Sequence, residues 1–343
     1  MHKFYKELSI AWMLSVSTFQ VFGQTVKTQI DFPRKIAGIA VNYRTNRIYV
    51  VAPSFGGAGD TLTVIDGNDD KPIANISVPT GAYLPAVNVF TNRIYIGSCN
   101  TYRSPSPCFV TVLDGVSNKV LSTTPITSTS GNGIQGIAVD STNDKIFVAN
   151  ASDRAVEVID GRNNKVIDSI GVSAGSPMGV AINPFNGRLY VPLGNSRIDV
   201  IATRPKKLIA TTNIGKANTN AAVNWTTGQV FVLDIVHGAE ANDEEDNTDE
   251  NEASFEVTAL DGRGAVLARL FLADEPCNID VDPASNLIFV LSNASHTMTV
   301  IDGAKRSVMA TIRGIHANFI ATNMTTGKAY LAGDSGLIVI TEK

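Results

Sequence analysis

The chain has 343 residues, of which 44% are hydrophobic and 17% charged, and its formal net charge is −4. This composition is that of a globular protein, and the negative balance argues against the basic class of nucleic-acid-binding proteins. The 28 glycines and 14 prolines indicate many turns, and therefore many short strands.

The beginning of the chain has the pattern of an export signal. Two lysines precede the largely apolar stretch 8–22, and cleavage after Gly23 would leave Gln24 as the first residue. This predicts a signal peptide over residues 1–23 and a mature chain that is secreted, periplasmic or attached to the cell surface. A buried N-terminal strand and an uncleaved membrane anchor are the alternatives. No later segment is long and apolar enough to span a bilayer.

One phrase recurs seven times along the rest of the chain. It consists of an apolar strand that ends in a polar residue, usually Asn or Asp, then a short turn, then a strand with an aromatic residue near its start. The copies occupy residues 39–51, 86–97, 137–150, 180–193, 221–234, 279–292 and 320–333. Their aromatic residues are Tyr49, Tyr95, Phe147, Tyr190, Phe231, Phe289 and Tyr330.

A second phrase follows each copy, typified by VIDG at 158–161, and in most units a further apolar strand follows that. Each unit therefore holds four short strands within about 40 to 50 residues, which is the signature of a propeller blade. We predict an all-β, seven-bladed β-propeller of four-stranded antiparallel blades over residues 24–343.

The two ends of the chain predict how the ring closes. The seventh unit stops at Lys343, directly after its third strand, and lacks a fourth. Residues 24–32 form an alternating strand that belongs to no unit. We expect this N-terminal strand to complete the last blade, which would remove the free edges of both.

The repeat at 145–170, KIFVANASDRAVEVIDGRNNKVIDSI, resembles the YVTN family β-propeller repeat, which is found in exported and surface-layer proteins. The resemblance covers about residues 24–343, and its most specific elements are the RIYV, KIFVAN and VIDG phrases. The fourth, fifth and seventh units depart from it, and the fourth and seventh have IAT and ITE in place of IDG. The resemblance implies a fold and an exported location more than a chemistry.

Three cysteines occur in the sequence. Cys99 and Cys108 flank a loop-like run, and an exported protein meets oxidising conditions, so we expect a disulfide between them. Cys277 is then left over, and we interpret it as a small buried hydrophobic residue.

Ligands of propellers usually bind at one end of the central channel, where the first strand of each blade begins. Aligning the seven copies places amide and aromatic side chains there. The predicted site residues are Tyr83, Gln135, Asn220, Asn278, His316, Asn318 and Phe319. The two aligned columns hold no carboxylate, unless the alignment is wrong by two residues, in which case Asp280 would point inward.

An acidic insertion over residues 240–256 lengthens the fifth unit. We interpret it as a solvated surface loop, because a dense run of like charges repels itself. The alternative is weak Ca²⁺ binding, or contact with a basic partner, through Asp243, Glu244, Glu245, Asp246, Asp249 and Glu250.

These observations favour an exported, non-catalytic, monomeric scaffold that binds an extracellular or cell-envelope protein or glycan, with no cofactor other than calcium. A metal-dependent lactonase or lyase is the second hypothesis, and it would need carboxylates or histidines in the channel. The third is nucleic-acid binding through one basic residue per hairpin, such as Arg47, Arg93 and Arg188, which form no dense patch.

Overall fold

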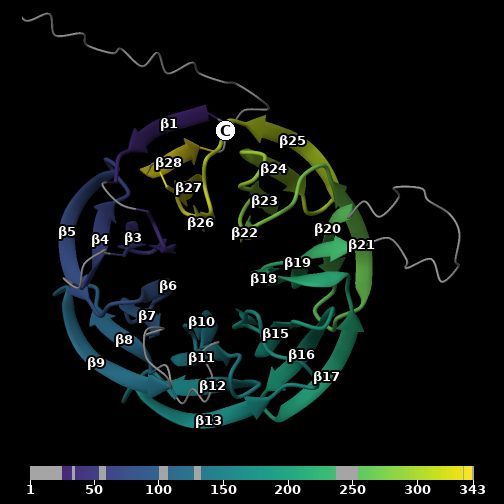
Figure 1. The fold of residues 1–343 in the computed structure, drawn as a ribbon, viewed down its shortest axis with the longest axis horizontal. Helices are drawn as coiled ribbons and strands as arrows, with labels where there is room; N and C mark the ends of the chain where they lie inside the picture. Colours follow the sequence, from purple (N-terminus) through teal and green to yellow (C-terminus); the bar gives the residue numbers. More distant parts are fainter. Residues whose placement is uncertain are drawn as a thin grey trace, which may run out of the picture.

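The computed structural model describes residues 25–32, 35–53, 59–99, 107–126, 133–236, 254–334 and 336–341. These residues form seven four-stranded antiparallel sheets, arranged as blades around a central channel (Figure 1). The predicted all-β, seven-bladed propeller is confirmed. This described part includes no helix that is long and apolar enough to cross a membrane. The predicted signal peptide lies outside the described residues.

The strands of each blade are ordered from the channel outward. The innermost strands are β2 (Gly38–Asn42), β6 (Ala82–Asn88), β10 (Ile134–Asp140), β14 (Ala181–Asn183), β18 (Lys216–Asn224), β22 (Asn278–Asp282) and β26 (Phe319–Asn323). The second strands are β3 (Arg47–Ala52), β7 (Arg93–Cys99), β11 (Lys145–Asn150), β15 (Arg188–Leu193), β19 (Gln229–Val236), β23 (Leu287–Ser292) and β27 (Lys328–Gly333). The third strands are β4 (Asp60–Asp66), β8 (Cys108–Asp114), β12 (Ala155–Asp160), β16 (Arg197–Thr203), β20 (Ser254–Leu260), β24 (Thr297–Asp302) and β28 (Gly336–Thr341). The outermost strands are β5 (Lys71–Val78), β9 (Lys119–Ile126), β13 (Lys165–Gly171), β17 (Lys206–Asn213), β21 (Val266–Leu272), β25 (Ser307–Arg313) and β1 (Thr25–Ile30). Blades 1 to 6 begin at β2, β6, β10, β14, β18 and β22, and blade 7 combines β26, β27 and β28 with β1.

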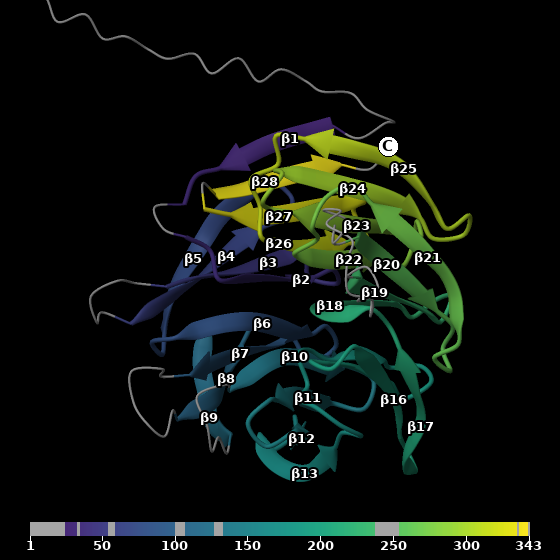
Figure 2. The same ribbon diagram turned by 45° about the vertical axis from the view of Figure 1, so that its right-hand side comes forward.

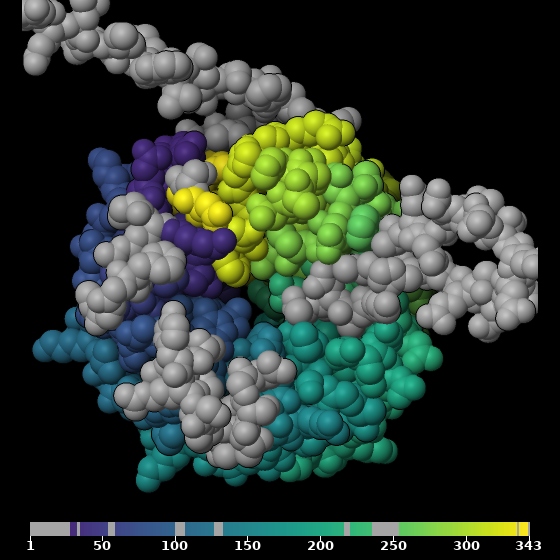
Figure 3. Space-filling view, viewed as in Figure 1, coloured from purple at the N-terminus to yellow at the C-terminus, as the bar shows by residue number. Residues whose placement is uncertain are grey.

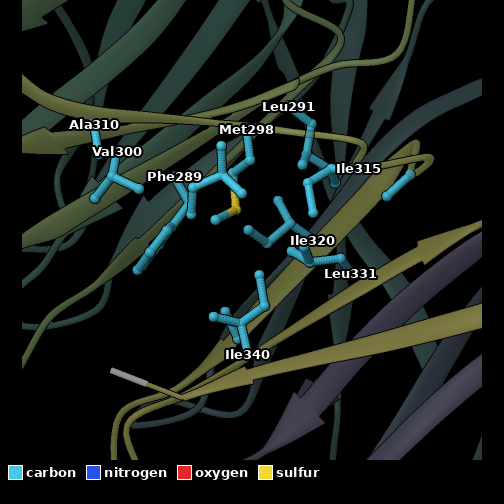
Figure 4. Packing of buried hydrophobic residues seen from close by; sticks show 12 residues of the cluster. Phe289, Leu291, Met298, Val300, Ala310, Ile315, Ile320, Leu331 and Ile340 are labelled. Atoms are coloured by element: carbon cyan, nitrogen blue, oxygen red, sulfur yellow. The ribbon is translucent and has the colours of Figure 1, made fainter. Parts of the chain in front are cut away.

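The hydrophobic cores lie between adjacent blades, so the second strands are buried on both faces. All seven aromatic residues of the repeat are at most 2% exposed. Between blades 6 and 7, Met298 and Phe289 pack against Ile320, Leu331 and Ile340 (Figure 4). Because each core is shared by two blades, a single unit could not bury its own apolar faces.

The turn between the first two strands explains why the repeat has Asn or Asp at the end of the first strand. The side-chain oxygen of Asn42 accepts hydrogen bonds from the backbone N–H groups of Arg44 (3.1 Å) and Thr45 (3.3 Å), which satisfies the turn. The last turn residue has a positive φ, as in Asn46 (52°) and Gly187 (63°). Only Gly, Asn and Asp adopt that conformation readily, and these are the residues found there.

The same inner-strand asparagines also join neighbouring blades. In each case the side-chain Nδ2 donates to a side-chain oxygen in the first turn of the next blade. The four pairs are Asn42 to Asn92 (2.7 Å), Asn88 to Asp144 (2.7 Å), Asn224 to Asn286 (2.6 Å) and Asn323 to Asn46 (2.8 Å). The inner asparagines are fully buried, so these bonds fix the angle between blades in a place that excludes water.

The N-terminal strand closes the ring as the sequence predicts. β1 pairs antiparallel with β28, from Thr25 opposite Thr341 to Ile30 opposite Leu337. Figures 1 and 2 both show β1, in purple, lying beside β28, in yellow. β1 lies in the sheet of blade 7, whereas β2, the next strand along the chain, begins blade 1.

The predicted acidic insertion is too long at its C-terminal end. Residues 254–256 belong to β20, where Glu256 is 4% exposed and accepts a bond from the Arg269 guanidinium at 3.2 Å. Because acidic residues continue into β20, the sequence pattern did not show where that strand begins. The six candidate Ca²⁺ ligands lie outside the described residues.

A disulfide joins Cys99 at the end of β7 to Cys108 at the start of β8. The two residues are opposite each other in the sheet and at most 6% exposed. A Cβ atom at Gly133 would collide with both sulfur atoms, so only glycine fits there without a shift. The disulfide of blade 2 therefore packs against the start of blade 3.

Replacing both of these cysteines by Ala is expected to lower the free energy of unfolding by about 2–3 kcal/mol, the chain-entropy value for a loop of roughly ten residues. Urea unfolding of both chains, with and without dithiothreitol, measures the difference. Reductant should destabilise the native chain and leave the double variant unchanged. Equal responses would show that the disulfide does not stabilise the fold.

Candidate functional site

The first mouth of the channel, where the innermost strands begin, contains a cavity of about 590 Å³. Blades 1, 2, 3, 5, 6 and 7 all contribute to its wall. Six of the seven predicted site residues line it: Tyr83, Gln135, Asn220, Asn278, Asn318 and Phe319. Figure 3 views the ring along the channel and shows the hollow at its centre. The structure thus brings these residues together, and their role in binding stays a prediction.

Tyr83 forms one fixed wall of this cavity. Its hydroxyl donates to the Ile134 carbonyl at 2.7 Å and lies 3.2 Å from the Cys99 sulfur. Burial raises the pKa of the phenol to about 12, so it stays neutral at physiological pH. Because the hydroxyl is hydrogen-bonded to the neighbouring blade, only the ring of Tyr83 is available to contact a ligand.

The amides supply the polar part of the wall. Asn278 is the first residue of β22, and Asn318 directly precedes β26, held by a backbone bond to Ala332 at 2.8 Å. Four neutral amides from four blades provide both donors and acceptors without a net charge. The free Cys277 thiol, half-buried, lines the same cavity, and burial raises its pKa.

The cavity wall also includes residues that the predicted set lacks, among them Lys35, Ile36, Pro53 and Ile134. Lys35 lies at its edge and forms an exposed ion pair with Asp334 at 3.2 Å. Lys35 precedes the aligned columns, so the repeat pattern gives no signal for it. It makes one side of the rim charged.

His316 is not part of the cavity wall. Its ring instead stacks on that of His296, with the centroids 3.8 Å apart, and both side chains are exposed. His316 is thus not among the residues that line this cavity, and its role as a site residue stays a prediction. It was chosen by position upstream of the innermost strand, and the backbone between Ile315 and Ala317 buries those neighbours and turns His316 outward.

The second mouth, where the innermost strands end, holds two further cavities, of about 200 and 240 Å³. Tyr43 and Trp225 line both. Trp225 packs against Phe185 with ring centroids 5.4 Å apart, and the Arg44 guanidinium lies 5.0 Å from the centre of the Phe90 ring. These aromatic residues occupy turn positions that vary among the copies, so the repeat pattern alone did not single them out.

Asp280 lies in the wall of the smaller of these cavities. The alignment of the copies was correct, and the side chain faces the channel two residues further along β22 than the first-mouth columns. Burial raises its pKa to about 6, partly offset by hydrogen bonds from Thr322. A pKa near 6 leaves it mostly ionised at neutral pH, in a cavity wall that it shares with Tyr43, Trp225 and Met324.

The basic residues at the start of the second strands are used between blades. Arg188 donates to the Gly262 carbonyl of the next blade at 2.7 Å, and Lys328 does the same to Gly67 at 2.6 Å. Arg93 bonds the Gly161 carbonyl in the same way. These three cations serve blade packing, and Arg47 pairs with Asp66 of its own blade. Nucleic-acid binding through these residues stays a hypothesis.

The enzyme hypothesis requires a ligand set for a metal. Within the described ranges, no group of three or more His, Cys, Asp or Glu side chains is close enough together to hold a metal ion. Asp280 has no second carboxylate or histidine in the wall of its cavity. The wall of this cavity thus offers a single carboxylate as a metal ligand.

No family model matches the sequence, and no curated protein matches it. Among solved structures, a chain of the hydrazine synthase of Kuenenia stuttgartiensis is similar, with a TM-score of 0.72 and 17% identity. The similarity covers 91% of this chain and 96% of that chain. At this identity it shows the fold alone. The chain is thus a seven-bladed β-propeller, and its chemistry has to be argued from its own residues.

Proposed function

We propose that this protein is an exported propeller of the YVTN-repeat type, which binds an extracellular or cell-envelope partner at the first mouth without catalysing a reaction. The observation that carries the proposal is the 590 Å³ cavity, in which neutral amides and two aromatic rings face one space. A neutral glycan fits this chemistry best. Its hydroxyls exchange hydrogen bonds with amides, and its apolar ring faces pack on aromatic side chains.

Two features support the exported location. The leader over residues 1–23 has the pattern of a signal peptide, and the disulfide between Cys99 and Cys108 is of a kind that persists in oxidising compartments. The RIYV and VIDG phrases support the assignment to the YVTN repeat type.

A panel of neutral cell-envelope oligosaccharides, titrated by calorimetry, tests the proposal. Asn220→Ala and Asn278→Ala are each expected to weaken binding by about five-fold, since one hydrogen bond contributes about 1 kcal/mol. Gln29→Ala, which removes an exposed amide on β1, is the matched control and should bind as the native chain does. The proposal fails if no oligosaccharide binds, or if all three variants behave alike.

A further inference from the structure

Two inner-strand residues depart together from the repeat. At the position of Asp280 the other six blades have alanine: Ala40, Ala86, Ala138, Ala181, Ala222 and Ala321. At the position of Thr322, in the neighbouring blade 7, the other six have an aliphatic residue: Val41, Val87, Val139, Ile182, Val223 and Val281. Alanine and valine would fill the channel here without any polar group.

These two departures contact each other. Asp280 Oδ2 accepts a hydrogen bond from the Thr322 backbone N–H at 2.7 Å and another from its Oγ1 hydroxyl at 3.0 Å. Thr322 therefore fixes the carboxylate against the inner strand of blade 7. A carboxylate and the residue that holds it thus replace alanine and valine at one of seven equivalent, partly buried positions. Such a change is costly for the fold and indicates a use other than packing.

The surroundings of Asp280 fit a cation. It lines the 200 Å³ cavity together with Tyr43, Trp225 and Met324, and this wall, which lies wholly within the described residues, contains no Lys, Arg or His. The carboxylate thus has no basic side chain beside it in the cavity. Aromatic faces attract cations, most strongly those of Trp and Tyr.

We propose that the second mouth binds a small organic ammonium ion, whose nitrogen pairs with the Asp280 carboxylate while its carbon chain lies against Trp225 and Tyr43. This site lies at the other end of the channel from the proposed glycan site and stands independently of it. The open aromatic turn formed by Phe185, 69% exposed and stacked on Trp225, extends the apolar surface outward from the cavity.

The pH dependence follows from the groups around the carboxylate. Asp282, on the same strand, raises the pKa of Asp280 further, and Tyr43 from blade 1 has its own pKa raised by burial and stays neutral. Arg44, beside Tyr43, lies over the Phe90 ring. As the pH falls through about 6, Asp280 takes up a proton and the attraction for a cation is lost.

Trp225 is a built-in probe of this site. The sequence has two tryptophans, Trp12 and Trp225, so Trp12→Phe in the full-length chain leaves Trp225 as the only one. Titration with butylammonium chloride at pH 7.5 is expected to change the Trp225 fluorescence with saturation. Butan-1-ol, which is of similar length but uncharged, should bind at least about tenfold more weakly, because it cannot form a charge-assisted hydrogen bond with the carboxylate.

Asp280→Asn in the same background is expected to weaken butylammonium binding by about tenfold or more and to abolish its pH dependence. The unsubstituted site should lose about tenfold in affinity between pH 7.5 and pH 5, as the carboxylate is neutralised. The double variant Asp280→Ala/Thr322→Val introduces the residues that other blades have at these positions, so it is expected to fold. It should also lose butylammonium binding.

Asp234→Asn is the matched control, because Asp234 is a buried carboxylate of β19, outside the cavity, with a pKa also raised to about 6. It should bind butylammonium as the parent does. The proposal is overturned if butan-1-ol binds as tightly as butylammonium, if no saturable signal appears, or if the Asp280 variants retain the affinity of the Asp234 control.

Discussion

Lys328→Met is expected to lower the free energy of unfolding by about 3–5 kcal/mol, because it removes the cation that lies against the buried Asp70 carboxylate. Lys328 Nζ lies 2.8 and 3.0 Å from the two Asp70 carboxylate oxygens, and the two side chains are 9% and 2% exposed. The Tyr330 hydroxyl adds a hydrogen bond to the same carboxylate at 3.3 Å. The pair joins blade 7 to blade 1, at the seam where the ring closes.

Urea unfolding followed by circular dichroism measures this effect. Lys206→Met is the control, since Lys206 forms a pair of similar length with Asp168 (2.7 Å) but with both side chains more than 40% exposed. Exposed pairs contribute at most about 1 kcal/mol, so this variant should stay close to the native chain. Adding Asp70→Asn to Lys328→Met should recover part of the loss. If Lys328→Met and Lys206→Met were equally stable, the buried pair would not hold the seam.

The fold could be predicted because the repeat is written into the sequence seven times. The repeat period, the turn residues and the strand order could all be recognised in the sequence. The N-terminal strand that belongs to no unit also corresponds to the fourth strand that the last unit lacks. The channel-facing columns could be read for the same reason, which is why six rim residues meet in one cavity. His316 precedes the innermost strand of blade 7 and lies outside the aligned columns, so the alignment gave no information on where its side chain lies.

The contacts between blades could not be predicted from the repeat. The bond from Arg188 to Gly262 spans 74 residues and depends on the angle between two blades, which no local pattern encodes. The same holds for Asp280 and Thr322. Each is an isolated exception in its own copy, and only the packing of blade 6 on blade 7 makes them a pair.

Removal of the N-terminal strand β1 is also expected to lower the free energy of unfolding by a large amount. A chain that begins at Asp31 lacks β1 and leaves the whole edge of β28 unpaired, where five register pairs now exist. With about one hydrogen bond per register pair on average and about 1 kcal/mol for each, the free energy of unfolding should fall by about 5 kcal/mol. Ile30 also leaves the cluster around Ile36 and Leu337, which adds to the loss.

The exposed β28 edge gives this prediction a second readout. Unpaired edges recruit other strands, so the shortened chain should form dimers or larger species in sedimentation velocity. A chain that begins at Gln24 is the control and should match the full-length protein in stability and association. A synthetic peptide of residues 24–32 should restore both properties to the shortened chain, while a scrambled peptide should not. A shortened chain that stayed monomeric, with an unchanged unfolding midpoint, would mean that the six complete blades and the remaining three strands close the ring without β1.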